Sequence, residues 1–188
     1  MTFGKMHNRL EGIATKKGII ISFLAAHAVL LVMMLFSFPR INKAFETAAF
    51  DLKTFGYSYE EALVMLENLD DVTRDFYIFP QLFLLDVLYP FLLALFLSLV
   101  IVRLSNLIHI NKNHFISYLF VLPYFAMLCD YAENIFIFLM ISNDESPSKA
   151  FVNLASTLTQ LKGGFTTLSW ISILVLFIIW IFRRIKKN

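Results

Sequence analysis

The residues best suited to chemistry in this chain lie inside an apolar stretch of membrane length. Asp130, Glu133 and Asn134 occur within residues 115–141, whose other side chains are mostly apolar. Positions three and four apart share one face of an α-helix, so these side chains point in the same direction. Ionisable groups at membrane depth are costly and need partners, which makes them candidates for a binding or catalytic site.

A second polar point lies in the preceding apolar stretch, where Asp86, Tyr89 and Pro90 fall on one helical face. Pro90 has no N–H to donate to the carbonyl of Asp86, so the sequence predicts a kink and a free carbonyl there. The free carbonyl and the carboxylate then belong to the same residue, which concentrates hydrogen-bond acceptors at one place.

Lys162 is the basic residue that the predicted spans place at the level of these carboxylates. Two carboxylates one turn apart in a low dielectric do not both ionise without a cation. We therefore expect Lys162 to pair with one of Asp130 and Glu133, the two candidate catalytic residues, while the other is protonated. The predicted ligand-binding residues are Asp86, Tyr89, Asp130, Glu133, Asn134, Thr159 and Lys162. A network that only ties four helices together, without a ligand, stays open.

Composition predicts the architecture that must position these residues. Hydrophobic residues make up 59% of the chain and charged residues 16%, against about 45–50% and about 25% in soluble domains. The apolar residues gather in runs of roughly 20, enough to cross a bilayer as a helix. We predict one all-α integral membrane domain, a four-helix transmembrane bundle over residues 1–188, with spans at about 18–38, 78–102, 115–141 and 163–182.

Local signals predict where helices begin and end. Pro39 is expected to stop the first span, while Ser146 and Pro147 are expected to open a long fourth helix. The outer segment 41–70 is predicted to form a cap of two short amphipathic helices, the second opened by a capping box at Ser58 and Glu61. Small residues recur at every fourth position of the fourth helix and predict close approach to a neighbouring helix. They are Ala155, Thr159, Gly163 and Thr167.

Charge distribution predicts the orientation, because basic residues favour the cytoplasmic side. We expect a multi-pass protein of the plasma (inner) membrane with both termini cytoplasmic. The expected inner segments carry Lys5, Arg9, Lys16, Lys17, Arg103, Lys112, Arg183, Arg184, Lys186 and Lys187. The expected outer segments carry Glu46, Asp51, Glu60, Glu61, Glu67, Asp70, Asp71, Asp75, Asp144 and Glu145.

Several kinds of site are not predicted. Cys129 is the only cysteine, so the chain can form neither an internal disulfide nor a cysteine-based zinc site. His27 lies near the middle of the first span and is expected to be a packed or hydrogen-bonded side chain, whereas His109 and His114 lie at the inner end. We therefore expect no metal and no cofactor, and no nucleic-acid partner.

Four short motifs resemble a pattern in a family of small bacterial four-span membrane proteins with no assigned activity. They are Gly56-Tyr57-Ser58-x-Glu60-Glu61-Ala62, Asp86-x-x-Tyr89-Pro90, Asp130-x-x-Glu133-Asn134 and Thr159-x-x-Lys162. The resemblance supports the site and implies no reaction. The loop layout is also similar to that of claudin-type proteins, but the cysteine pair of their first loop is absent here.

Three functions fit these features. The first is a binding protein whose polar site takes a lipid or amphiphile, or a helix of a partner membrane protein or a second copy. The second is an intramembrane lipid-modifying enzyme, in which Asp130 or Glu133 is the general acid/base and Lys162 holds an anionic group. The third is a small proton-coupled transporter, which fits less well because the inner half offers only His27 as a continuation.

Overall fold

The computed structural model describes residues 3–110, 114–143 and 145–186, and this part of the chain is helical without a strand. Lys112, Asp144 and Lys187, which were used to predict orientation, lie outside the described residues. Four helical stretches are long and apolar enough to cross a membrane, as predicted. They are Lys16–Phe45, Asp71–Leu107, Phe115–Ser142 and Lys149–Ile185.

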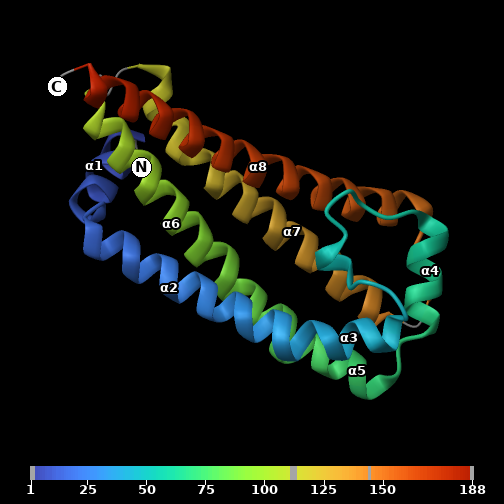
Figure 1. Ribbon diagram of the computed structural model, residues 1–188. Coiled ribbons are helices and arrows are strands. Elements are labelled where there is room, and N and C mark those ends of the chain that lie inside the picture. The colour runs from blue at the N-terminus through green and yellow to red at the C-terminus, as the bar shows by residue number, and fades with distance from the viewer. Residues whose placement is uncertain (1–2, 111–113, 144, 187–188) are drawn as a thin grey trace.

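The four stretches run side by side along the molecule (Figure 1). Helix α6 (Asp86–Leu107) packs against both α2 (Lys16–Val32) and α7 (Leu122–Ser142), and α8 (Lys149–Ile185) packs mainly on α7 and also on α6. Both termini lie at one end, here called the terminal end. The opposite end, called the cap end, carries α3 (Phe38–Phe45), α4 (Tyr59–Glu67) and α5 (Asp71–Phe76).

The first span continues past Pro39, so the prediction that this proline ends the helix is wrong. A π-helical segment, η1 (Met33–Ser37), joins α2 to α3 (Phe38–Phe45), and Pro39 occupies the first turn of α3. A first-turn proline is tolerated because its missing N–H has no helical partner there. The helix ends where Glu46 turns to a φ of 56°.

The segment after the first span forms less regular helix than predicted. A separate helix over residues 41–52 is absent: residues up to Phe45 complete α3, and only a 3-10 turn, η2 (Phe50–Leu52), follows. The predicted capping box does open α4 (Tyr59–Glu67). The Glu61 N–H donates to Ser58 Oγ at 3.1 Å, and the Ser58 N–H donates to Glu61 Oε2 at 3.4 Å.

The second span begins earlier than predicted, with α5 (Asp71–Phe76) capped by Asp70. A π-helical segment, η3 (Tyr77–Leu85), connects α5 to α6 and is broken by extended backbone at Phe79, immediately before Pro80. Pro80 thus interrupts the helix within the second span. Helix α6 continues through Pro90 without a break.

The last two spans follow the predicted order with one shifted boundary. A 3-10 segment, η4 (Phe115–Val121), leads into α7. Helix α8 begins after Ser148, whose hydroxyl accepts a hydrogen bond from the Phe151 N–H at 3.3 Å. The prediction of Ser146 as N-cap is therefore wrong, because a serine two positions later takes that role.

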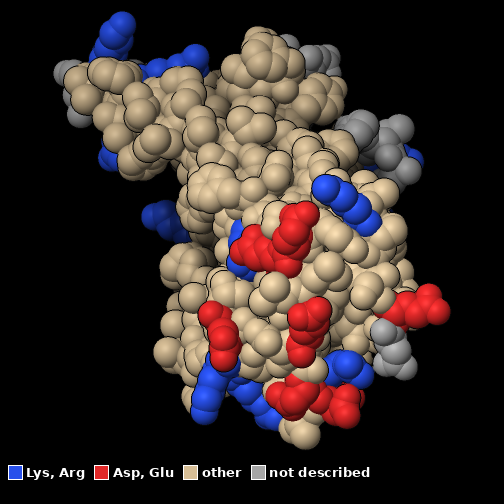
Figure 2. All heavy atoms as spheres, turned by 90° about the vertical axis from the view of Figure 1, so that its right-hand side faces the viewer, with Lys and Arg blue, Asp and Glu red and all other residues tan. Residues whose placement is uncertain are grey.

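Apolar packing forms one cluster toward each end. The cluster at the cap end includes Phe45, Phe50 and Met65, and the one at the terminal end includes Leu99 and Phe120. The exposed charges also differ between the ends, since acidic side chains gather over the cap end (Figure 2). This face carries Glu46, Glu60, Glu61, Glu67, Asp70, Asp71 and Asp75, together with the basic Arg40 and Lys43.

Candidate functional site

Lys162 lies between the two carboxylates that α7 presents toward α8. Its Nζ is 3.2 Å from Asp130 Oδ1 and 2.5 Å from Glu133 Oε2. The Glu133 side chain is fully buried, and those of Lys162 and Asp130 are 16% and 10% exposed. The lysine thus contacts both acids, which corrects the expectation that it would pair with only one of them.

Three of the other predicted residues join the same group. The Thr159 hydroxyl donates to Glu133 Oε1 at 2.6 Å. The Asn134 amide donates to the carbonyl of Asp86 at 3.3 Å, which is the carbonyl that has no N–H partner at Pro90. Tyr89 is half-buried near Asp86 and Asp130. The structure therefore brings the whole predicted set together, while its role in binding stays a prediction.

A fourth carboxyl group comes from the loop beyond the first span. The Tyr77 hydroxyl donates to Asp51 Oδ2 at 2.5 Å, and the Asp51 carboxyl group lies close to that of Asp86. Two carboxyl groups from distant parts of the chain thus lie side by side. We refer to Asp51, Asp86, Asp130, Glu133 and Lys162 as the acidic centre.

From sequence, Asp51 is expected only among the outer charges, and no local pattern points to Tyr57, Tyr77 or Gln81 as site residues. A signal for Asp51 was present, because it is the one charged residue within Ala48-Ala49-Phe50-Asp51-Leu52. An isolated acid in a short apolar segment is a sign of a buried polar contact. The contact partners of Tyr57 and Tyr77 depend on the path of the loop, which no local pattern shows.

Several oxygen atoms of the centre are buried without a hydrogen-bond partner among the described residues. They are Asp51 Oδ1, Asp86 Oδ2 and Asn134 Oδ1, and the side chains of Asp86 and Asn134 are 3% and 8% exposed. Gln81, fully buried one π-helical turn before Asp86, has neither amide atom partnered there. Buried polar atoms in proteins nearly always have a partner, so this group is suited to accept donors from a ligand or water.

A small cavity borders the centre between α6, α7 and α8. Its volume is about 20 Å³, enough for about one water molecule. Asp130 and Lys162 form its polar side. The remaining lining is Pro90, Leu93, Ala94, Leu97, Pro123, Ala126, Met127 and Thr166.

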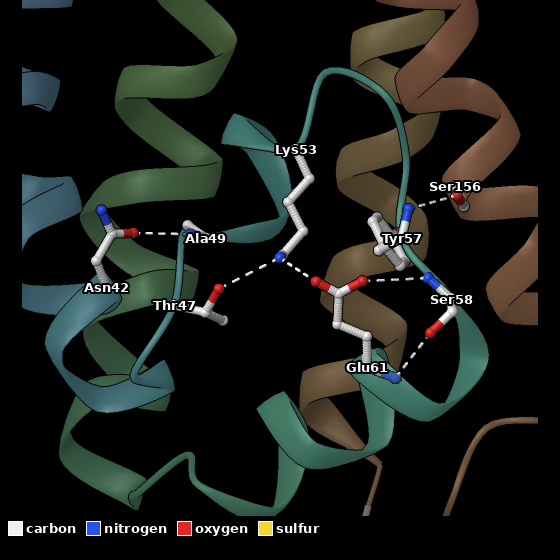
Figure 3. A network of polar contacts seen from close by, with 8 residues as sticks. All are labelled: Asn42, Thr47, Ala49, Lys53, Tyr57, Ser58, Glu61 and Ser156. Atoms are coloured by element: carbon white, nitrogen blue, oxygen red, sulfur yellow. Dashed lines mark hydrogen bonds and ion pairs between the residues drawn. The ribbon is translucent and has the colours of Figure 1, made fainter.

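The loop of residues 46–58, here called the cap loop, covers the centre from the cap end. The Tyr57 hydroxyl faces Thr159 and Glu133, and burial is the main reason that the pKa of Tyr57 is raised above its usual value. The backbone N–H of Tyr57 donates to Ser156 Oγ of α8 at 2.8 Å (Figure 3). The loop is thereby attached to α8 directly above Thr159.

Two glycines allow the cap loop to lie close to α8. Gly56 has a φ of +84°, and a Cβ there would lie 2.5 Å from Ser156 Oγ. A Cβ at Gly163 would lie 2.9 Å from the Thr54 side chain. Gly163 thus admits the cap loop and not a neighbouring helix, so the predicted close helix approach fails at this position, whereas Ala155 and Thr159 of the same pattern are fully buried. Thr167, at the end of that pattern, is exposed.

A salt bridge closes the cap loop on α4. Lys53 Nζ lies 2.5 Å from Glu61 Oε1 and 3.4 Å from Thr47 Oγ1 (Figure 3). The hydrogen bond from Lys53 is the main cause that lowers the pKa of Glu61. The same glutamate completes the capping box, so α4 and the cap loop are held by one side chain.

The remaining candidates lie apart from the acidic centre. His27 Nδ1 is 2.8 Å from the carbonyl of Phe23, so it is a hydrogen-bonded side chain as expected. His109 and His114 are exposed. Among the described residues, no three histidine, cysteine or acidic side chains are arranged to hold a metal ion.

No protein-family model, curated protein or solved structure matches this chain. The fold and site therefore rest on the chain's own residues. The resemblance to the bacterial four-span family stays a prediction.

Proposed function

We propose that this chain is a membrane binding protein whose acidic centre takes the polar group of a lipid or other amphiphile. The observation that supports this most is the set of buried oxygen acceptors without a partner among the described residues. Intramembrane ionisable groups are functional candidates by default, and here an apolar-lined cavity borders them. A fully satisfied structural network would not leave such atoms unpaired.

Access is proposed to run between α6, α7 and α8, with the cap loop as the cover on the cap end. The cavity is small, so binding requires local opening of the packed helices or of the loop. The loop is held by a few polar contacts, including those from Ser156 to Tyr57 and from Gln160 to Phe55. Phe50 of the same loop is fully buried in the cap-end cluster, so opening is proposed for the exposed part at Thr54 and Phe55.

The cap end is proposed to face the outside of the plasma (inner) membrane. The terminal end carries Lys5, Arg9, Lys16, Lys17, Arg103, Arg183, Arg184 and Lys186. This bias follows the positive-inside rule. In a Cys129→Ser background, cysteine introduced at Glu67 should react with an impermeant thiol reagent in intact cells, and cysteine at Arg9 should not. The reverse labelling would overturn this orientation.

Mass spectrometry of lipids retained by the purified protein tests the binding function. The wild-type chain should retain a specific amphiphile that Asp130→Asn and Glu133→Gln lose. Asp71→Asn serves as the control, because the Asp71 side chain is 90% exposed. Retention of the same lipids by all four proteins would contradict the proposal, and a co-purifying membrane protein lost in the same variants would indicate a partner helix instead.

A lipid-modifying enzyme is a second candidate, favoured by the closeness of the Asp51 and Asp86 carboxyl groups. One carboxyl group of such a pair is protonated and can act as a general acid while the other accepts a proton. Turnover of a labelled lipid pool should then be lost in both Asp51→Asn and Asp86→Asn. Unchanged turnover in either variant would exclude this pair as the catalytic group.

A further inference from the structure

We infer that the group bound at the acidic centre is a cation, specifically the ammonium group of an amine-bearing amphiphile. This inference rests on the proposed binding function and names the chemical class of its ligand. Charge, hydrogen-bonding capacity and size each point to this class.

The charge of the centre is unbalanced. Asp51, Asp86, Asp130 and Glu133 face a single lysine, Lys162, which already contacts two of them. Two other basic groups of the cap end are paired elsewhere, since Lys53 Nζ is 2.5 Å from Glu61 and an Arg74 nitrogen is 3.2 Å from Asp71, while Arg40 and Lys43 are exposed. Carboxyl groups this close cannot all ionise without more positive charge, so a bound cation stabilises the centre and an anion opposes it.

Hydrogen bonding leads to the same class. Three donors beside the acids are engaged, since Tyr77 donates to Asp51, Thr159 to Glu133 and the Asn134 amide to the Asp86 carbonyl. Asp51, Asp86 and Asn134 each keep a buried oxygen without a hydrogen-bond partner among the described residues, whereas the unpartnered donors nearby are the Gln81 amide nitrogen and the Tyr57 hydroxyl. An ammonium group has three donors and no acceptor, whereas phosphate and carboxylate groups bring mainly acceptors.

Size separates an ammonium group from a larger head group. The bordering cavity of about 20 Å³ holds about one water-sized group. A primary ammonium group is of that size and a phosphate is not. The apolar lining, with Leu93, Leu97 and Met127, suits an attached hydrocarbon chain better than a free hydrated ion.

Thermal unfolding in a neutral maltoside detergent tests the inference. The added probes are dodecylammonium, dodecanol and dodecanoate, which share a chain and differ in head group, and methylammonium chloride, which has no chain. Dodecylammonium at saturating concentration should raise the Tm of the wild-type protein by about 5–10 °C, as expected for a ligand well above its Kd. The other three should not.

Variants test whether the rise in Tm arises from binding at the acidic centre. Asp51→Asn should weaken dodecylammonium binding at least about tenfold. If this variant does not fold, Asn134→Leu is the second variant, because it removes an oxygen without a hydrogen-bond partner. Asp71→Asn is the matched control and should keep the full shift. An equal shift in Asp51→Asn and Asn134→Leu would overturn the assignment to this centre.

The other probes separate failure of the inference from failure of the proposed function. Stabilisation by dodecanol or dodecanoate alone would overturn the cationic class while an amphiphile site remains. Stabilisation by methylammonium alone would support the charge class and overturn the attached chain. No shift with any probe, together with no retained lipid, would overturn both proposals and leave a centre occupied by protons and water.

Discussion

Both halves of the bundle have an apolar cluster, and they differ in the polar groups that are buried beside it. Toward the cap end, α6, α7 and α8 meet at buried charges, with Lys162 between Asp130 and Glu133. Toward the terminal end, α1 (Phe3–Ile13), α6 and α8 meet through apolar side chains such as Leu10, Leu99 and Leu176. Polar contacts there include the hydrogen bond from the Ser98 hydroxyl to the Phe120 carbonyl at 2.8 Å and that from the Asn106 amide to Glu11 Oε1 at 3.1 Å.

Because of this difference, the two halves should respond differently to substitution. Apolar packing tolerates exchange of one side chain for another of similar volume. A buried charge depends on named partners, and its removal leaves another charge unpaired. The cap-end half therefore provides a site of defined chemistry, but its buried charges tolerate few substitutions. The terminal-end half provides apolar packing that does not depend on that site.

The largest effect is expected for Lys162→Met. It leaves Asp130 and Glu133 buried without their cation and should destabilise the protein by about 3–5 kcal/mol. Adding Glu133→Gln should recover part of that loss. Unfolding of the purified single and double variants in detergent measures both values, with the exposed Lys149→Met as control. A neutral effect of Lys162→Met, or strict additivity with Glu133→Gln, would contradict a coupled buried charge network.

Leu99→Ala tests the other half and should destabilise by about 2–5 kcal/mol, since it removes a fully buried side chain. Unlike the lysine change, it should be additive with Glu133→Gln, because distant and independent sites do not couple. The same unfolding measurement checks this. Coupling above about 0.5 kcal/mol would show that the halves are not independent.

Thr159→Val should cost about 1–3 kcal/mol, because it removes the hydroxyl that donates to the buried Glu133 at 2.6 Å. Valine has nearly the same volume, so packing is retained. Thr167→Val on the same helix is exposed and should be close to neutral. Equal effects of the two changes would indicate that helix propensity, and not the hydrogen bond, decides the outcome.

The smallest effect is expected at the cap. Glu61 has a pKa lowered below its usual 4.5, first through the hydrogen bond from Lys53. A carboxyl group whose pKa is lower in the folded than in the unfolded state stabilises the fold at pH values above its ordinary pKa. This stabilisation is lost as the pH falls through the lowered pKa. Since the Glu61 side chain is 43% exposed, solvent screens the pair and Lys53→Met should cost less than about 1 kcal/mol. The difference in unfolding free energy between the wild-type protein and Lys53→Met should be larger at pH 7 than at pH 3; an equal difference at both pH values would assign it to packing.

The sequence alone determined the features that depend on local pattern. Runs of apolar residues located four spans, because hydropathy and length act within one segment. The capping box at Ser58 followed from residues three apart. Asp130, Glu133 and Asn134 could be placed on one face, and the free carbonyl of Asp86 anticipated, because helical geometry relates near neighbours.

Tertiary structure decided everything that joins distant segments. Asp51 enters the centre only because the cap loop folds back over Tyr77 and α8, and Lys162 contacts both acids only because α7 and α8 pack closely there. Pro39 continues a helix because the preceding π-helical segment and the packing of α3 accommodate it. Such contacts depend on the relative positions of whole elements, and those positions are set by the summed packing of the bundle and not by any one stretch of residues.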